Sequence, residues 1–302
     1  MASKPSIGGQ AVMEGVMMRG PRSWAVACRQ PTSEIAVQVH SIPSVKSKFF
    51  RLPLIRGAYV LVESMTLGIK ALKISAGYAL QGSTEEEQAA PERAIGWSLG
   101  FALVAFSALF IALPAFLSKV GGRAIGVTGD FQQNLVEGAV RIGFFLGYIF
   151  LISLIPDIRR VFQYHGAEHK TIYAYENDDP LDPEVVDNYS TLHVRCGTNF
   201  LFIVMFLTIV GHFVLDATLT RFGIVSIPIR VALRILVIPL LAGISYEVIR
   251  AAGRKDDSVL FKLVSLPGLA LQKVTTRPPT RDQIEVAIKA MEAVIERESQ
   301  VV

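Results

Sequence analysis

The sequence predicts a mainly α-helical membrane protein. We expect a polytopic bundle of four transmembrane helices, with a cytosolic N-terminal β-hairpin and cytosolic C-terminal helices. A mean hydropathy of +0.42, with 51% hydrophobic residues, is too high for an ordinary soluble protein of 302 residues. The charged residues, 19% of the chain, gather near its two ends and in one central loop. Long apolar runs separate these charged regions, which is the pattern of a multi-pass membrane protein.

Four apolar segments each have close to the roughly 20 residues that a helix needs to cross the hydrocarbon core. They are Ile95–Ser118, Val136–Ile155, Phe200–Thr220 and Val225–Ile249. Lys and Arg are frequent before the first segment, between the second and the third, and after the fourth, and they are rare in the other two connections. The positive-inside rule therefore predicts a multi-pass protein of the cell membrane, with both termini and the 156–199 loop in the cytoplasm.

The N-terminal region has elements of its own. Trp24–Gln30 and Glu34–His40 alternate between apolar and polar residues, and Pro31-Thr32-Ser33 between them predicts the turn of a β-hairpin. Ala58–Leu80 is apolar but carries three charges, which favours an amphipathic helix, either on the inner leaflet or packed in the cytosol. The polar, acidic stretch 81–92 is typical of a linker.

The C-terminal region has a helical pattern. Thr280-x-x-Gln283 resembles a capping box, and apolar residues recur at helical spacing from Ile284 onward. We therefore divide the chain into a cytosolic N-terminal region (1–94), a four-span bundle that includes the cytosolic loop 156–199 (95–250), and a cytosolic C-terminal helical region (251–302).

Composition excludes several classes of function. The formal net charge is only +4, and no Lys/Arg stripe with interleaved aromatic residues is present, so we expect no nucleic-acid partner. Two cysteines do not make a disulfide framework, which favours a reduced location for both. The apolar content instead makes membrane lipid the expected partner, while the sequence specifies no oligomeric state.

The stretch His165-Gly-Ala-Glu168-His169 predicts a metal site. Two imidazoles four residues apart share one face of a helix, a geometry that a divalent metal can use. We expect zinc, which needs three or four nitrogen, sulfur or oxygen ligands. His193 would be the third ligand and Cys196 a fourth, with Glu247 as an acidic alternative. Glu168 would act as general base or as ligand. The alternative is that Gly166 breaks the helix and the histidines are merely solvated.

A second polar group falls inside the predicted spans. His212 and Asp216 are one turn apart in the third span, and three arginines lie at a similar depth: Arg141, Arg230 and Arg234. Because ionisable residues in a bilayer usually face a partner or a cavity, we expect Asp216 to pair with one or more of the arginines, with His212 joining them. Two interpretations remain open: a polar pocket for a lipid phosphate or an ion path, and a purely structural ion pair.

The N-terminal stretch from Gly8 to Pro21 is rich in glycine and methionine. Glycines allow a close approach of the backbone. Glu14 and Arg19 would either reach the metal site or an anionic ligand, or form a structural pair with each other while the methionines pack a core.

Four motifs together resemble the YqhQ-like bacterial membrane family: GGQAVMEGVMMRGP from Gly8, YHGAEHKTI from Tyr164, HVRCGTNF from His193 and PGLALQKVTTRPP from Pro267. They span nearly the whole chain. The resemblance implies a multi-span protein of the bacterial inner membrane that is a metal-dependent enzyme. Its motif residues here would be Glu14, Arg19, His165, Glu168, His169, His193, Arg195 and Cys196.

The expected function is a metal-dependent hydrolase at the cytoplasmic face of the membrane, acting on a lipid, a lipid-linked group or a membrane-protein segment. A metal held by His165, His169 and His193 would lower the pKa of water, and Glu168 or Glu14 would take its proton. The alternative is a non-catalytic membrane factor that assists assembly or transport, with the histidines as a structural zinc clip or without any metal.

Overall fold

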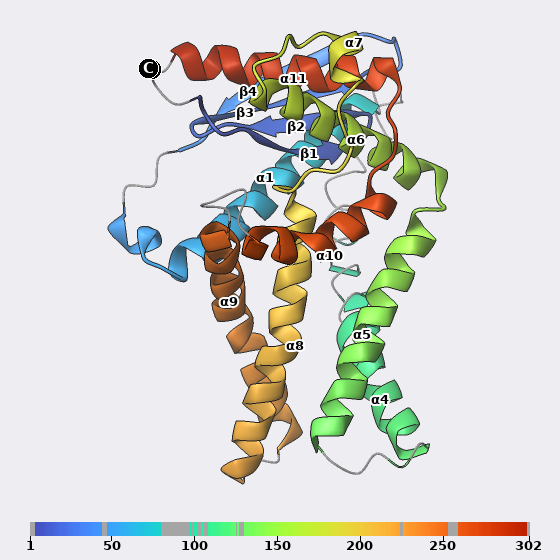
Figure 1. The fold of residues 1–302 in the computed structure, drawn as a ribbon, viewed down its shortest axis with the longest axis vertical. Coiled ribbons are helices and arrows are strands. Elements are labelled where there is room, and N and C mark those ends of the chain that lie inside the picture. The colour runs from blue at the N-terminus through green and yellow to red at the C-terminus, as the bar shows by residue number, and fades with distance from the viewer. Residues whose placement is uncertain are drawn as a thin grey trace.

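The computed structural model describes residues 4–43, 47–79, 108–124, 130–223, 226–252 and 259–300, together with six single positions: Trp97, Gly100, Phe101, Val104, Ala105 and Gly126. Its elements form a polar head, built around a β-sheet, above a stem of apolar helices (Figure 1). The predicted linker at 81–92 lies outside the described residues.

The head contains a four-stranded antiparallel sheet in the order β1-β2-β3-β4. The strands are β1 (Gly8–Val12), β2 (Gly15–Arg19), β3 (Ser23–Arg29) and β4 (Ile35–Ser41). The predicted hairpin is confirmed as β3 and β4, whose register places Trp24 opposite His40. Strands β1 and β2 were not predicted. They are joined by a two-residue turn in which Glu14 adopts a positive φ of 50°.

Helices cover both faces of the sheet. Helix α1 (Ile55–Ala79) packs on one face, where Leu67 and Ala71 join a cluster with Val12, Met17, Trp24, Val26 and Cys28. Helices α6 (Pro156–Glu176) and α11 (Arg281–Gln300) cover the other face, and the core there includes Val16, Met18, Ala25, Ala27, Tyr164, Ile284, Met291 and Val294. The head is therefore assembled from three separate parts of the chain.

Helix α1 confirms the predicted helix at 58–80, and it begins three residues earlier than expected. It packs against the sheet and also against helix α9 (Ile227–Ala252), where a Cβ added at Gly57 would lie 2.7 Å from Tyr246 Cβ. A short 3-10 turn, Lys48–Arg51, precedes it.

The C-terminal helix α11 begins as its capping box predicts. The backbone N–H of Thr280 donates to Gln283 Oε1 at 2.9 Å, which satisfies a donor that the first helical turn leaves without a partner. Near its other end, the carboxylate of Glu298 accepts from the backbone N–H of Arg22 at 2.8 Å and from Ser23 Oγ at 2.7 Å. Glu298 is only 4% exposed, so this contact locks the last helix to the start of β3.

Replacing Glu298 by glutamine should destabilise the head. Burial alone would raise the pKa of Glu298, but the hydrogen bonds from Ser23 and Arg22 outweigh it and hold the pKa below its ordinary value. Such a carboxylate contributes stability above its unfolded pKa of about 4.3, and this stability is lost as the pH falls through the folded pKa. We expect Glu298→Gln to lower the free energy of unfolding at pH 7 by about 1–3 kcal/mol, because a buried hydrogen-bond network loses its charge.

Thermal unfolding of the full chain in detergent at pH 7 and pH 4 measures this effect. The variant should lose less stability than the wild type between these two pH values. Glu296→Gln, an exposed change two residues earlier on the same helix, is the matched control. Equal stability of the two variants at pH 7 would contradict the role of Glu298.

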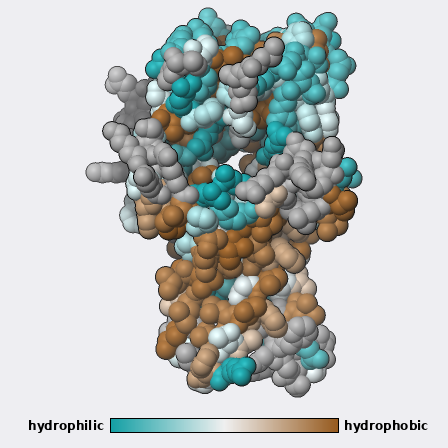
Figure 2. All heavy atoms as spheres, turned by 60° about the vertical axis from the view of Figure 1, so that its left-hand side comes forward, coloured by the Kyte–Doolittle hydropathy of each residue, from teal (hydrophilic) through white to brown (hydrophobic). Residues whose placement is uncertain are grey.

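Among the residues that the structure describes, the stem contains three helices that are long and apolar enough to cross a membrane. Their apolar segments are Leu135–Ile152 in α5 (Asp130–Ile152), Gly197–Arg221, which is the whole of α8, and Ala232–Ala251 in α9. Large apolar side chains such as Phe150, Phe206 and Leu236 are exposed on them, and Figure 2 shows the resulting hydrophobic surface below the hydrophilic head.

The expected count of four spans is corrected to three among the described residues. The predicted span at 95–118 falls largely on residues outside the described ones. A π-helical turn, Ala108–Ala112, leads there into α4 (Leu113–Ala124), which has only 12 residues.

Helix α10 (Val259–Thr275) lies across the molecule between the head and the stem (Figure 1). It packs against α8 and contacts α9 and α5 less extensively. A short helix, α7 (Pro183–Val186), lies in the segment between α6 and α8. The described helices and the four strands together confirm a mainly helical chain with an N-terminal sheet.

Candidate metal centre

Helix α6 carries both histidines of the central motif. Pro156 occupies its first turn, where a missing backbone N–H does no harm, and the helix then continues without a break to Glu176. Gly166 therefore does not end the helix. His165 and His169 lie one turn apart, with ring centroids separated by 4.4 Å. His169 is 1% exposed, so it is not a solvated surface residue.

Cys196 reaches the two histidines from another part of the chain. It is the N-cap residue of α8, where its sulfur accepts from the backbone N–H of Thr198 at 3.5 Å and from Thr198 Oγ1 at 3.3 Å. Sγ also lies 3.2 Å from His165 Nε2. One potential ligand atom from each of His165, His169 and Cys196 falls within 4.8 Å of the others, and we call these three residues the His–His–Cys group.

The backbone orients both imidazole rings. His165 Nδ1 lies 2.8 Å from the carbonyl oxygen of Thr275, and His169 Nδ1 lies 2.6 Å from the carbonyl oxygen of Thr191. A carbonyl only accepts, so each Nδ1 carries the proton and donates it. Each Nε2 is then left with its lone pair, which is the arrangement that a metal-binding histidine needs.

The surroundings of the His–His–Cys group favour the protonation states that bind a metal ion. Burial lowers the pKa of His169, which keeps its imidazole neutral. Burial alone would raise the pKa of the Cys196 thiol, but the nearby His169 and the donors of Thr198 outweigh it and bring that pKa below its ordinary value. His169 Nε2 is buried without a hydrogen bond of normal geometry to any described residue. Neutral imidazoles and a thiolate are the species that bind zinc.

Glu168 lies beside the group in a cavity of about 180 Å³. His169 and Cys196 line the same cavity, together with Gly9 of strand β1. Its side chain packs so closely on Gly9 that a Cβ added there would lie 2.8 Å from Glu168 Cγ. Burial raises the pKa of Glu168 to about 8. Its Oε2 has no hydrogen-bond partner among the described residues, so one carboxyl oxygen is not engaged by the protein.

His193 borders the cavity but is held outside the His–His–Cys group. Its ring centroid is 5.6 Å from that of His169. Nε2 lies 3.2 Å from Glu176 Oε2, and Nδ1 accepts from the backbone N–H of Arg195 at 3.3 Å. Since Glu176 and Arg195 engage both ring nitrogens, no lone pair is left for an ion. Within the described part of the chain, the structure brings Cys196 rather than His193 to the two histidines.

Arg195 and Glu176 form the rim of the cavity. Arg195 Nη1 donates to Glu176 Oε1 at 2.9 Å, and its side chain is 49% exposed. The hydrogen bond from His193 lowers the pKa of Glu176 despite partial burial, and Arg195 adds to that effect. Sequence analysis did not single out Glu176, which is one turn beyond Ile172 on the helix face that carries His169.

The donor set fits a divalent cation. Two imidazole nitrogens and one thiolate suit zinc, and three protein ligands leave the fourth tetrahedral position open, as in catalytic zinc sites. The buried Nε2 of His169 and the buried Oε2 of Glu168, both without partners among the described residues, are atoms that a bound ion or its ligand water would satisfy.

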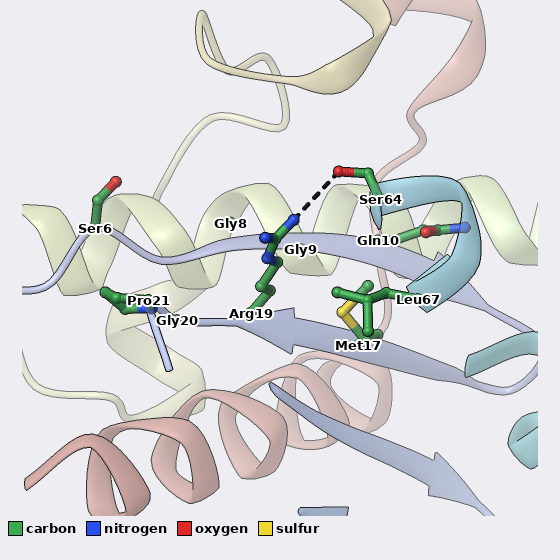
Figure 3. A pocket seen from close by; sticks show the side chains of 10 residues that line it. All are labelled: Ser6, Gly8, Gly9, Gln10, Met17, Arg19, Gly20, Pro21, Ser64 and Leu67. Carbon is green, nitrogen blue, oxygen red and sulfur yellow. Dashed lines mark hydrogen bonds between the residues drawn. The ribbon is translucent and has the colours of Figure 1, made fainter. Parts of the chain in front are cut away.

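Glu14 and Arg19 do not join the His–His–Cys group, and they do not pair with each other. The Glu14 carboxylate binds Arg160, with Oε2 2.6 Å from Nη2, and accepts from Tyr164 Oη at 3.2 Å. Arg19 pairs with Glu63 of α1 and donates to Ser64 Oγ at 3.2 Å. It lines a second cavity of about 340 Å³ between α1 and strands β1 and β2 (Figure 3).

The acidic alternative Glu247 is also engaged elsewhere. Its carboxylate forms two hydrogen bonds with the guanidinium of Arg56, one of them 2.6 Å from Nε to Oε1. This ion pair joins α9 to α1, and so it links the stem to the head.

The predicted polar group in the stem does assemble. Arg234 of α9 pairs with Asp216 of α8, and His212 Nε2 lies 3.2 Å from the carbonyl oxygen of Arg234. Glu137, which sequence analysis missed, binds Arg141 at 2.7 Å and lies 3.5 Å from Arg234. The cavity here holds only about 10 Å³, which has no room for a lipid phosphate. The side chain of Arg230 lies outside the described part of the structure.

Comparisons with known proteins agree with the expected relationship. The family model described as "Protein of unknown function (DUF1385)" matches residues 52–297. The "Uncharacterized protein YqhQ" of Bacillus subtilis (strain 168) is 33% identical over 309 residues, which cover 98% of this chain and 94% of that protein. No solved structure matches the chain. The resemblance to YqhQ-like proteins is therefore confirmed, and the chain belongs to the DUF1385 family.

Proposed function

We propose that the three apolar helices cross the bacterial inner membrane, that the predicted span at 95–118 supplies a fourth crossing, and that the head lies in the cytoplasm. The large exposed apolar side chains of the stem support this proposal, since their surface suits lipid (Figure 2). The head end of the stem carries Arg159, Arg160 and Lys170, whereas the α8–α9 turn at the opposite end carries Arg221. Both ends of the described chain, strand β1 and helix α11, belong to the head and would then be cytoplasmic.

The site supports a metal-dependent hydrolase at the cytoplasmic membrane face. A single observation carries this proposal: the buried carboxylate of Glu168, with Oε2 not engaged by any described residue, lines the same cavity as His169 and Cys196. A structural zinc site has no need of a buried carboxylate beside it. Zinc is the expected ion, and the substrate would be a lipid or another membrane-associated molecule.

Each residue has a defined task in this proposal. His165, His169 and Cys196 would hold the ion, which supplies a Lewis acid that activates water near neutral pH. Thr275 and Thr191 fix the two rings through their carbonyl oxygens, so the nitrogens are oriented before any ion binds. A cation beside Glu168 would lower its raised pKa and favour the carboxylate, and Oε2 would then accept the proton of the attacking water and pass it to the leaving group. Gly9 keeps the strand backbone clear of that carboxylate.

A second candidate function is a non-catalytic factor for membrane assembly or transport, with the metal as a structural clip. This alternative is favoured because the three ligand residues, and a carbonyl group that orients one of them, come from three different helices. His165 and His169 belong to α6, Cys196 caps α8, and Thr275 ends α10. An ion at this point would fasten the head to two helices below it.

Replacing Glu168 by glutamine separates the two functions. We expect Glu168→Gln to retain the metal, because none of the three ligands changes, and to lose hydrolysis by at least about 100-fold, because the proton acceptor is gone. Purified wild type and variant are analysed for zinc, iron and manganese. They are then incubated with inner-membrane vesicles, and the released products are compared by mass spectrometry.

Glu184→Gln provides the control, since Glu184 is exposed and pairs only at the surface with Arg281. The hydrolase proposal fails if wild-type protein purified without chelator holds no metal. It also fails if wild type and Glu168→Gln release the same products. In that second case, a loss of thermal stability on metal removal would favour the structural clip.

A further inference from the structure

A groove runs beside helix α10 where the head meets the stem. It has a volume of about 480 Å³, and we call it the α10 groove. Helix α10 contributes Lys262, Leu266 and Leu269 to its wall. The opposite wall comes from the end of α6 and from the segment that precedes α8.

The wall of the α10 groove is mainly apolar. Leu266 and Leu269 of α10 line it together with Val194 and Tyr173. Leu266 is 58% exposed, and Leu263 and Val259, which precede it by three and seven residues, are 63% and 81% exposed. Residues at this spacing form one stripe on a helix. An apolar stripe therefore continues along the outer side of α10 from the groove, which suits a hydrocarbon chain.

The mouth of the groove is charged. Lys262 is exposed one turn before Leu266, and Arg195 extends from the opposite wall, where it also binds Glu176. Two cations and one carboxylate leave an excess of one positive charge at the mouth. An apolar channel with a cationic mouth is complementary to an amphiphile that has an anionic headgroup.

The groove lies at the depth where lipid headgroups would be found. Helix α10 crosses the molecule at the head end of α8 and α9 (Figure 1), and the hydrophobic surface gives way to the hydrophilic surface near this level (Figure 2). An amphipathic helix at such a boundary, with lysines beside an apolar stripe, is typical of an interfacial helix. The occupant that fits this position is a lipid of the surrounding bilayer.

We propose that the α10 groove binds an acidic phospholipid, with its phosphate at Lys262 and Arg195 and an acyl chain along Leu266 and Leu269. The groove shares Arg195 and Glu176 with the cavity that contains Glu168 and the His–His–Cys group. A headgroup held at Arg195 would thus lie at the entrance of that cavity. This names acidic phospholipids as the substrate class, a step that rests on the proposed hydrolase.

Native mass spectrometry of the full-length protein in detergent tests the binding. The probes are phosphatidylglycerol and phosphatidylcholine with identical acyl chains. We expect phosphatidylglycerol to bind about tenfold more tightly, and Lys262→Glu to remove that preference. Lys273→Glu is the matched control, because it makes the same charge change at an exposed position of α10 outside the groove. Leu269→Trp, which fills the groove, should weaken both lipids.

Equal binding of the two lipids would overturn the proposal, and so would equal effects of Lys262→Glu and Lys273→Glu. An unchanged affinity in Leu269→Trp would show that the lipid binds elsewhere. The result is separable from the hydrolase, because lipid binding is measured on chelator-treated protein as well. If protein that never holds metal still prefers phosphatidylglycerol, the hydrolase proposal is refuted and the proposal of a lipid-binding groove stands. If protein that holds metal shows no preference for phosphatidylglycerol, lipid binding in the α10 groove is refuted and the hydrolase proposal is not affected.

Discussion

Protein in which alanine replaces His169 is expected to bind zinc at least about 100-fold more weakly than the wild type. Among the described residues the group would supply three protein ligands, so the loss of one would leave two donors, too few for a stable tetrahedral site. Few nearby side chains could take the place of the lost ligand. His193 is engaged by Glu176 and by the N–H of Arg195, and Glu168 would have to give up its place beside Gly9.

Elemental analysis of purified protein, followed by competition with a zinc-binding dye, measures this loss. The matched control is His40→Ala, which removes an imidazole that stacks on Trp24 in the sheet. The control should hold about one ion per chain, as the wild type would. If His169→Ala and His40→Ala bind zinc with equal affinity, then the ion does not bind at the His–His–Cys group.

Adding a single methyl group at Gly166 is expected to damage both the fold and the site. A Cβ there would lie 2.1 Å from the carbonyl oxygen of Arg277, a backbone atom that cannot turn aside. The segment that would be pushed away is held to α6 by the N–H of Arg277, which donates to the Phe162 carbonyl at 2.9 Å. It also includes Thr275, whose carbonyl orients His165. We expect a loss of about 3 kcal/mol or more in the free energy of unfolding.

Thermal unfolding in detergent and zinc content should therefore fall together in Gly166→Ala. Gly77→Ala is the control, since a Cβ on Gly77 in α1 would meet nothing within 4 Å. That change should be neutral or stabilising by up to about 1 kcal/mol, because alanine favours a helix more than glycine does. Gly166→Ala protein with wild-type stability and full zinc content would contradict the close packing of α6 on the 275–277 segment.

Local patterns were sufficient to predict several elements of the head. The alternation of β4 and the turn residues Pro31-Thr32-Ser33 indicate the β3–β4 hairpin, and the capping box fixes the start of α11. Strands β1 and β2 escaped prediction for a physical reason. Helices cover both faces of the sheet, so every position of β2 from Gly15 to Met18 is buried and no alternation remains to be seen.

The candidate site was predictable only in part. The spacing of His165 and His169 on one helix face is a local property, and it identified half of the site. The sequence predicted both His193 and Cys196 as ligands. The position of His193 outside the group is not a local property, because Glu176, 17 residues away, engages its ring. The backbone carbonyl groups of Thr191 and Thr275 could not be predicted from sequence motifs, because every residue has a backbone carbonyl group.

The partners of charged residues were equally beyond the reach of local sequence. Glu14 binds Arg160, and Arg19 binds Glu63, so both partners come from distant helices. In the stem, Glu137 is four residues before Arg141, a spacing that already indicates a pair on one helix. That signal was present in the sequence and would have completed the group around Asp216.

The head's composition from three distant segments has a consequence for biogenesis. While the ribosome is still making the stem, the sheet face that contains Val16, Met18 and Ala25 has no α11 to cover it. The nascent chain therefore keeps an apolar sheet face uncovered until the codons for α11 have been translated. Assembly of the apolar helices α5, α8 and α9 and closure of the head are therefore separate events, and closure follows the synthesis of α11.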